Sequence, residues 1–347
     1  METAPAFSGW RPRERRLVRQ GPSVAARKVY IYIERDFMSD SQSWPRIAVV
    51  GAGAVGGYFG GRLAEAGAPV VLIGRKAFVD AVNAHGLIIE QAAGERAIKV
   101  EATADIGAVA DAELVLFCVK SNDTVSSAKE IAPLLASNAL MICLQNGVDN
   151  IERIRAATKI QALSAAVYIG VSAPEPGRIK YAARGDLILG PENEKTKHAQ
   201  QIFERGNIGC RLTNKIEGEM WLKLLCNSAL NAISALGHVR YGEIAENLEA
   251  RSLMQKIVDE VLAVARGAAV QIPGVEDSES GMAAAMQIAT QVKEAFSSTA
   301  QDIQRGKPTE IDSLNGYIAR RGAELGIEAP VNHALFTLVK MREGKSG

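Results

Sequence analysis

The stretch IAVVGAGAVGGYFGGRLAEAG, residues 47–67, decides the fold. An apolar run ends at Gly51, the spacing Gly51-x-Gly53-x-x-Gly56 follows, and a helix-like pattern begins at once. In a nucleotide-binding βαβ unit the first glycine allows a tight turn, the second lets the backbone approach a pyrophosphate, and the third lets the helix pack on the strand. The N–H groups of Ala54 and Val55 at the helix start then face the anion. Because strand, glycines and helix all agree, the stretch predicts a dinucleotide-binding fold.

The same texture continues through the first part of the chain. Short apolar runs alternate with helix-like segments, which is typical of parallel strands covered by helices on both faces. Residues 168–190 instead hold two strand-like pieces around a Pro and Gly turn, which predicts an antiparallel hairpin at the edge of the sheet. The predicted parallel strands are 46–51, 69–74, 114–120, 140–147 and 163–170.

Past residue 212 the pattern changes to long helical periods, with predicted helices at 216–236, 246–270, 279–305 and 309–325. Pro308, a Thr309-x-x-Asp312 capping pattern and Gly326 punctuate the last of these, so we expect it to begin at Thr309. The fold class is therefore an α/β N-terminal Rossmann-type domain, residues 46–213, followed by an all-α C-terminal domain, residues 214–347.

Composition excludes several classes of protein. The chain has 347 residues, 47% of them apolar, and a formal net charge of +1, which gives no electrostatic case for binding nucleic acid or a membrane surface. No apolar stretch reaches the ~20 residues needed to span a bilayer. Four cysteines lie far apart without metal-site spacing, so we expect buried thiols, no metal and a cytoplasmic protein.

Residues 1–45 differ from the rest of the chain. They are rich in arginine and lack the apolar core of a secretory signal. We expect an N-terminal extension that is poorly ordered, or translation from a start upstream of Met38, with an organelle transit peptide as the alternative.

The end of the second predicted strand indicates the choice of dinucleotide. An NAD-preferring site has Asp or Glu there, whereas this chain has Gly74-Arg75-Lys76. Because a guanidinium pairs with a 2′-phosphate, Arg75 favours NADP, unless Arg75 and Lys76 are only solvated surface charges. Lys120 ends another strand at the carboxyl edge of the sheet, where ligands bind in open α/β folds, although it could be a surface lysine.

A polar stripe crosses an otherwise apolar helix in WLKLLCNSALN, residues 221–231. Positions four apart share a helix face, so Lys223, Asn227 and Asn231 line up among leucines. An unpaired buried ammonium is costly, so Lys223 needs a carboxylate or a substrate anion nearby, or else structural hydrogen bonds hold it. Glu310 is an available partner, although it could serve only as helix N-terminal charge.

These residues resemble the ketopantoate reductases (2-dehydropantoate 2-reductases). The resemblance rests on GAGAVGGYFGGRLAEAG (51–67), LQNGVDN (144–150), WLKLLCNSALN (221–231) and the segment 297–332 that begins SSTAQDIQRGKPTEIDSLNG, and it spans roughly residues 46–341. It implies a Rossmann-type domain, a helical domain and NADPH bound between them.

The resemblance also implies roles for single residues. Lys223 matches the catalytic lysine and Glu310 the active-site glutamate, while Asn227 and Asn231 match asparagines that bind the substrate. Ser298 matches a serine that holds the substrate carboxylate, and Asn146 an asparagine near both nicotinamide and substrate. Lys120, Arg75 and Ala173 match cofactor contacts. Tyr241 stands where some members have a substrate-binding asparagine, which leaves the identity of the 2-oxo acid open.

The implied activity is NADPH-dependent reduction of ketopantoate to pantoate, in pantothenate and coenzyme A biosynthesis, with Lys223 as the general acid. Two rivals stay open: a related NADP-dependent reductase of another 2-oxo acid or of an opine-type imine, and a redox sensor that binds NADP without catalysis. The expected partners are a small-molecule substrate and, because helical second domains of this size often pair, a second copy in a homodimer.

Overall fold

The computed structural model describes residues 43–344. The predicted N-terminal extension, residues 1–45, lies almost wholly outside this range. We refer to residues 43–213 as the N-terminal region and to residues 214–344 as the helical region. The predicted domain boundary near residue 213 stays a prediction.

The N-terminal region is built on one 10-stranded sheet in the order β4-β3-β9-β8-β7-β6-β1-β2-β5, with β10 paired to β9. The strands are β1 (Ile47–Val50), β2 (Val70–Ile73), β3 (Leu87–Gln91), β4 (Gly94–Ile98), β5 (Glu101–Thr103), β6 (Leu114–Phe117), β7 (Leu140–Cys143), β8 (Ala162–Glu175), β9 (Arg178–Gly190) and β10 (Cys210–Leu212). Strands β2, β1, β6, β7 and the start of β8 pair in parallel, as the apolar runs predict.

Strand β1 shows why these runs are apolar at every position. Ile47 and Val49 belong to a core on one face of the sheet, and Ala48 and Val50 to a second core on the other. Helix α1 (Ala54–Glu65) packs in the first core and α3 (Thr124–Ile131) in the second. The remaining helices of this region are α2 (Lys76–His85), α4 (Asn150–Ala157) and α5 (Glu194–Arg205). Since alternate side chains of a strand point to opposite faces, a strand covered on both sides needs apolar residues throughout.

The hairpin predicted at residues 168–190 is present as antiparallel β8 and β9, but its predicted place at the sheet edge is wrong. Residues 178–180 of β9 pair with β3, and residues 187–189 pair with β10. The hairpin is therefore interior, and these additional pairings cover the outer side of β9. The apolar pattern does not predict β4, for example, because four of its five residues are exposed and form no apolar run.

The helical region surrounds α6 (Ile216–Gly237), which packs against four other helices of that region. These are α8 (Leu248–Gly267), α9 (Ser278–Gln291), α10 (Ser298–Gln304) and α12 (Pro330–Arg342). Helices α7 (Tyr241–Glu246) and α11 (Asn315–Leu325) complete the region. With the N-terminal sheet, this confirms the predicted α/β plus all-α class.

Two predicted helices differ from the structure. The single helix predicted at 279–305 is two helices, because α9 ends at Gln291 and Ser297 caps a new helix, α10. The predicted start at Thr309 is also wrong. The Thr309 hydroxyl bonds to Glu343 instead of capping a helix, and a short 3-10 turn at Ile311–Ser313 precedes α11. The predicted end at Gly326 is confirmed by its left-handed φ of 71°.

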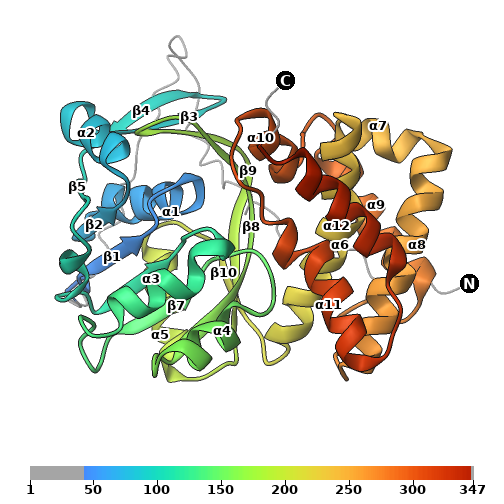
Figure 1. The fold of residues 1–347 in the computed structure, drawn as a ribbon. Helices are drawn as coiled ribbons and strands as arrows, with labels where there is room; N and C mark the ends of the chain where they lie inside the picture. The colour runs from blue at the N-terminus through green and yellow to red at the C-terminus, as the bar shows by residue number, and fades with distance from the viewer. Residues whose placement is uncertain (1–42, 345–347) are drawn as a thin grey trace, which may run out of the picture. The chain divides into compact units, whose positions relative to one another are not determined.

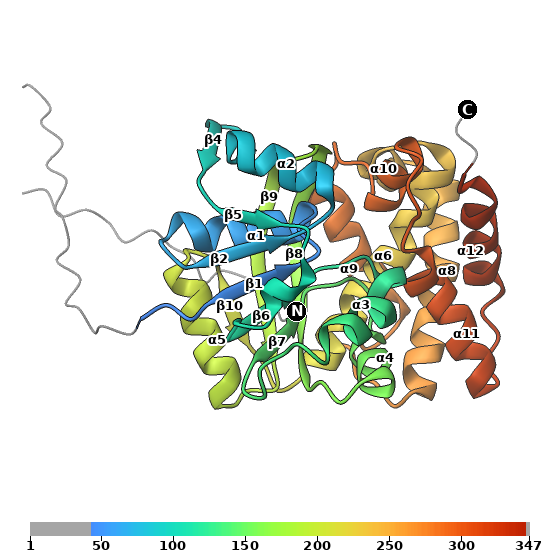
Figure 2. The ribbon, with the colours of Figure 1, turned by 60° about the vertical axis from the view of Figure 1, so that its left-hand side comes forward.

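The hairpin joins the two regions. Helix α1 packs on one side of β8 and β9, and α6 packs on the other side (Figure 1). Figure 2 shows the helices of the helical region gathered beside the edge of the sheet. Within residues 43–344, no helix is long and apolar enough to cross a membrane.

Candidate active site

The glycine loop between β1 and α1 has the shape that a bound pyrophosphate needs. Gly51 has a left-handed φ of 89°, and a Cβ there would lie 2.6 Å from the Val119 backbone nitrogen. A Cβ on Gly56 would lie 2.6 Å from the Gly51 carbonyl oxygen, whereas nothing lies within 4 Å of a Cβ built on Gly53. Among the described residues no side chain caps α1 and its first turn holds no acidic residue, so its leading N–H groups can accept an anion.

The two basic residues after β2 differ in their surroundings. Lys76 pairs with Asp80 at 2.9 Å in an exposed i,i+4 bridge on α2. Arg75 is exposed at the N-cap of that helix, and no described side chain forms an ion pair with it. Of the two, Arg75 is therefore the residue able to reach a phosphate on the ribose.

Lys223 lies on the polar stripe of α6 and donates from Nζ to Asn146 Oδ1 at 2.8 Å. Burial lowers the pKa of Lys223 to about 8, against an opposing effect of the Glu310 carboxylate, and the Arg184 guanidinium lowers the pKa further. The carboxylate that the sequence requires is thus nearby, but the Asn146 amide stands between it and the ammonium. Lys223 consequently remains an amine that loses its proton close to neutral pH.

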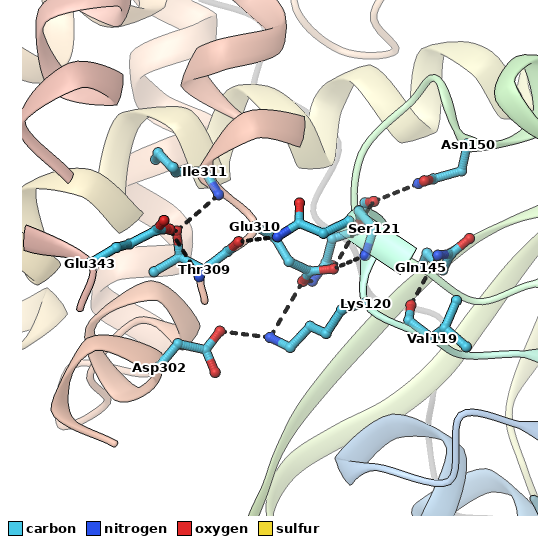
Figure 3. A network of polar contacts seen from close by, with 12 residues as sticks. Val119, Lys120, Ser121, Gln145, Asn150, Asp302, Thr309, Glu310, Ile311 and Glu343 are labelled. Atoms are coloured by element: carbon cyan, nitrogen blue, oxygen red, sulfur yellow. Dashed lines mark hydrogen bonds and ion pairs between the residues drawn. The ribbon is translucent and has the colours of Figure 1, made fainter. Parts of the chain in front are cut away.

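Glu310 is a buried carboxylate, 8% exposed, whose two oxygens both bond to the N-terminal region (Figure 3). Oε1 accepts from the Ser121 backbone N–H at 2.9 Å and from the Ser121 hydroxyl at 2.8 Å. Oε2 accepts from Asn146 Nδ2 at 2.9 Å. Burial acts to raise the pKa of Glu310, but the charge of Lys120 and these donors outweigh it and hold the pKa below its ordinary value. At neutral pH Glu310 is therefore ionised.

Lys120 also crosses between the two regions. Its Nζ lies 2.6 Å from Asp302 Oδ2 on α10 and 3.9 Å from Glu310 Oε2. Burial acts to lower the pKa of Lys120, and the two carboxylates outweigh that effect and raise it. Lys120 is therefore a fixed positive charge next to Glu310.

We call Lys120, Ser121, Asn146, Lys223, Asp302 and Glu310 the polar cluster. Lys120 and Ser121 follow β6, and Asn146 follows β7, so the cluster stands at the carboxyl edge of parallel strands, where open α/β sheets bind ligands. Four of its members are predicted from the sequence, whereas Ser121 and Asp302 are missed. Their only signal is adjacency, since Ser121 follows Lys120 and Asp302 lies four residues after Ser298.

The other predicted substrate residues lie around α6. Asn231, 2% exposed, accepts through Oδ1 from the Tyr241 hydroxyl at 2.8 Å. Burial raises the pKa of Tyr241, so this hydroxyl stays protonated. Asn227 is partly buried one turn before Asn231, and Ser298 is the exposed first residue of α10. Since α10 packs against α6, Ser298 and the stripe belong to neighbouring elements.

Two predicted cofactor residues stand apart from this arrangement. Arg75 follows β2, and Ala173 is a partly buried residue of β8 that packs against the core under α1. Within residues 43–344, neither side chain hydrogen-bonds to the polar cluster. The tertiary structure thus brings Lys120, Asn146, Lys223 and Glu310 together, with the glycine loop beside Val119 next to them.

Two family models match the chain one after the other. The model described as "Ketopantoate reductase PanE/ApbA" matches residues 47–194, and "Ketopantoate reductase PanE/ApbA C terminal" matches residues 215–343. The chain belongs to the ketopantoate reductase family. Ketopantoate reductases are oxidoreductases that use a nicotinamide dinucleotide, so the resemblance stated from the sequence is confirmed for the family and the class of reaction.

Individual ketopantoate reductases match along almost their whole length. The 2-dehydropantoate 2-reductase of Pyrococcus horikoshii is 33% identical over 309 residues, which are 87% of this chain and 99% of that protein. The crystal structure of a PanE/ApbA family ketopantoate reductase from Ralstonia eutropha JMP134 has a TM-score of 0.81 at 40% identity and covers 86% of this chain and 99% of its own. D-Mandelate dehydrogenase with NADH and anilino(oxo)acetate reaches a TM-score of 0.80 at 23% identity, covering 86% and 98%, which shows a shared fold alone.

Proposed function

We propose that this ketopantoate reductase reduces 2-dehydropantoate to pantoate with NADPH, using Lys223 as the general acid. The observation that carries the proposal is the contact of Lys223 with Asn146, which joins an ammonium of the helical region to the carboxyl edge of the sheet. The curated relatives named 2-dehydropantoate 2-reductase support the substrate.

The residues around the glycine loop fit a dinucleotide. Gly51, Gly53 and Gly56, with the N–H groups of Ala54 and Val55, would hold the pyrophosphate, because open space surrounds Gly53 and the first turn of α1 has no competing acid. Arg75 would bind the 2′-phosphate that distinguishes NADPH from NADH. Lys120, Asn146 and Ala173 would lie toward the nicotinamide end.

When bound, NADPH supplies the hydride for the ketone carbon of the 2-oxo acid. Lys223 donates a proton to the former carbonyl oxygen, so that the ketone gains one hydride and one proton and becomes an alcohol. A pKa of about 8 leaves Lys223 mostly protonated at neutral pH and makes it a stronger acid than an ordinary lysine. Since Asn146 takes only one of the three ammonium donors, the others can reach the carbonyl oxygen.

Glu310 cannot serve as the proton donor, because its pKa lies below its ordinary value and it is ionised at neutral pH. It instead offsets the positive charge of Lys223 and Lys120 and accepts a hydrogen bond from the substrate 4-hydroxyl. Asn227 and Asn231 contribute neutral, directional contacts, and Ser298 donates to the substrate carboxylate.

A second candidate is reduction of another 2-oxo acid. The observation that favours it is Tyr241, a residue larger than asparagine whose hydroxyl already bonds to Asn231. Its ring occupies space next to a predicted substrate contact and would alter the side of the site that meets the distal end of the substrate.

The test is the rate of NADPH oxidation with a panel of 2-oxo acids, repeated with NADH. We expect the highest kcat/KM for ketopantoate, and a lower value for trimethylpyruvate, the same acid without the 4-hydroxyl. Preference for trimethylpyruvate would select the second candidate, and NADPH binding without turnover of any 2-oxo acid would select the sensor. The homodimer stays a prediction that light scattering can test.

A further inference from the structure

Ser121 is a fully buried serine, 0% exposed, that the proposed reaction does not use. It follows Lys120 at the carboxyl edge of the sheet and gives both its backbone N–H and its hydroxyl to the same oxygen of Glu310, at 2.9 and 2.8 Å (Figure 3). The two residues are 189 positions apart in the chain, so this double contact depends entirely on how the two regions meet.

The backbone around Glu310 gives its side chain little guidance. Residues 307–309 have no regular structure, and Glu310 precedes the 3-10 turn at Ile311–Ser313 rather than sitting inside a helix. The orientation of the carboxylate therefore depends on its partners. Asn146 donates a hydrogen bond to one oxygen, and Ser121 donates two to the other.

The Ser121 hydroxyl has one proton and two acceptors within reach. Glu310 Oε1 lies at 2.8 Å and the Asn146 carbonyl oxygen at 2.9 Å. A hydrogen bond to an ionised acceptor is about twice as strong as one between neutral groups, so the proton is directed to the carboxylate. The Asn146 carbonyl keeps a separate donor, Asn150 Nδ2, at 2.7 Å. The hydroxyl thus acts mainly on Glu310.

We propose that Ser121 is a positioning residue for the reaction: its hydroxyl and N–H fix the ionised Glu310 carboxylate in the orientation that meets the substrate and balances the charge of Lys223. This inference rests on the proposed function for Glu310. It adds a residue of the dinucleotide-binding side that controls a carboxylate supplied by the helical region.

The first experiment compares Ser121→Ala with the wild type in steady-state kinetics across pH. Loss of a donor to the charged form raises the pKa of Glu310, so the acid limb of kcat/KM moves to higher pH, by about one unit for a tenfold loss. We expect kcat/KM to fall roughly tenfold, and NADPH affinity to stay unchanged because Lys120 is retained. Ser121→Thr keeps the hydroxyl and should restore the limb. Ser126→Ala, an exposed serine of the same segment, is the matched control.

The second experiment is a double-mutant cycle with Glu310→Gln. If Ser121 acts through the carboxylate, Ser121→Ala changes kcat/KM much less in the Glu310→Gln background than in the wild type. An equal loss in both backgrounds, or an acid limb that does not move, overturns the proposal and leaves Ser121 a structural residue only.

A third measurement does not require turnover and separates this inference from the proposed function. The thermal midpoint lost through Ser121→Ala should be larger at pH 7 than near pH 4, where Glu310 gains a proton, and should not depend on pH in the Glu310→Gln background. A wild type that reduces no 2-oxo acid but shows this pattern refutes the function while sustaining the contact. A loss independent of pH in both backgrounds refutes the inference.

Discussion

Replacing Lys223 with methionine should remove the activity and at the same time stabilise the fold. Methionine has a similar length and no charge, so the change removes the ammonium without leaving a large cavity. Burial lowers the pKa of Lys223 from an ordinary 10.5 to about 8, which means that the folded protein holds this proton at a cost. At about 1.4 kcal/mol per pKa unit, that cost is roughly 3 kcal/mol at neutral pH.

Part of this gain is lost, because Asn146 Oδ1 no longer receives its hydrogen bond from Lys223. An unsatisfied buried acceptor costs about 1 kcal/mol or more, which leaves a net stabilisation of about 2 kcal/mol. For a protein of this size the thermal midpoint should rise by about 4 °C. Loss of a general acid should lower kcat by about 10² to 10⁴.

The sign of the pH dependence follows from which state binds the proton. Between pH 8 and 10.5 the unfolded chain keeps the Lys223 proton and the folded protein does not, so wild-type stability from this group rises with pH. The advantage of Lys223→Met should therefore be full below pH 8 and shrink toward pH 10.5. In the wild type, kcat/KM should decline as pH rises through about 8, as the acid loses its proton.

The assays are thermal unfolding at several pH values and NADPH oxidation with the best 2-oxo acid. Lys215→Met is the matched control, because Lys215 is exposed at the N-cap of the same helix. It should change neither the activity nor the midpoint by much. A destabilised Lys223→Met, or one with near-normal turnover, would refute the assignment of a buried catalytic ammonium.

Three further changes test other parts of the site. Arg75→Gln should weaken NADPH binding about tenfold or more and leave NADH binding unchanged in fluorescence titrations, whereas an equal effect on both would show that Arg75 does not bind the 2′-phosphate. Gly51→Ala should destabilise the fold in urea unfolding, because φ is 89° and the new Cβ would lie 2.6 Å from the Val119 nitrogen; unchanged stability contradicts the close approach. Tyr241→Phe should cost about 1 to 3 kcal/mol of stability by leaving Asn231 Oδ1 without its donor, and should raise the KM of the 2-oxo acid. No change in either quantity would mean that the Tyr241 hydroxyl does not hold Asn231.

Much of the fold could be predicted from local sequence. The glycine loop and the parallel strands β1, β2, β6 and β7 are visible because a strand buried on both faces must be apolar at each position. Strand β4 escaped because most of it is exposed, and the break between α9 and α10 escaped because both pieces carry a helical pattern. The interior place of β9 depends on pairing with β3 and β10, which its own sequence does not encode.

The candidate site divides in the same way. By itself the sequence determined that α6 carries Lys223, Asn227 and Asn231 on one stripe, because helix periodicity fixes which side chains share a face. Only the tertiary structure decided what meets that stripe. Lys223 reaches Asn146 across 77 positions, and Glu310 reaches Ser121 across 189. Contacts at such separations arise from the packing of whole elements, and so the amide between ammonium and carboxylate, like the serine that holds the carboxylate, has no local signature in the chain.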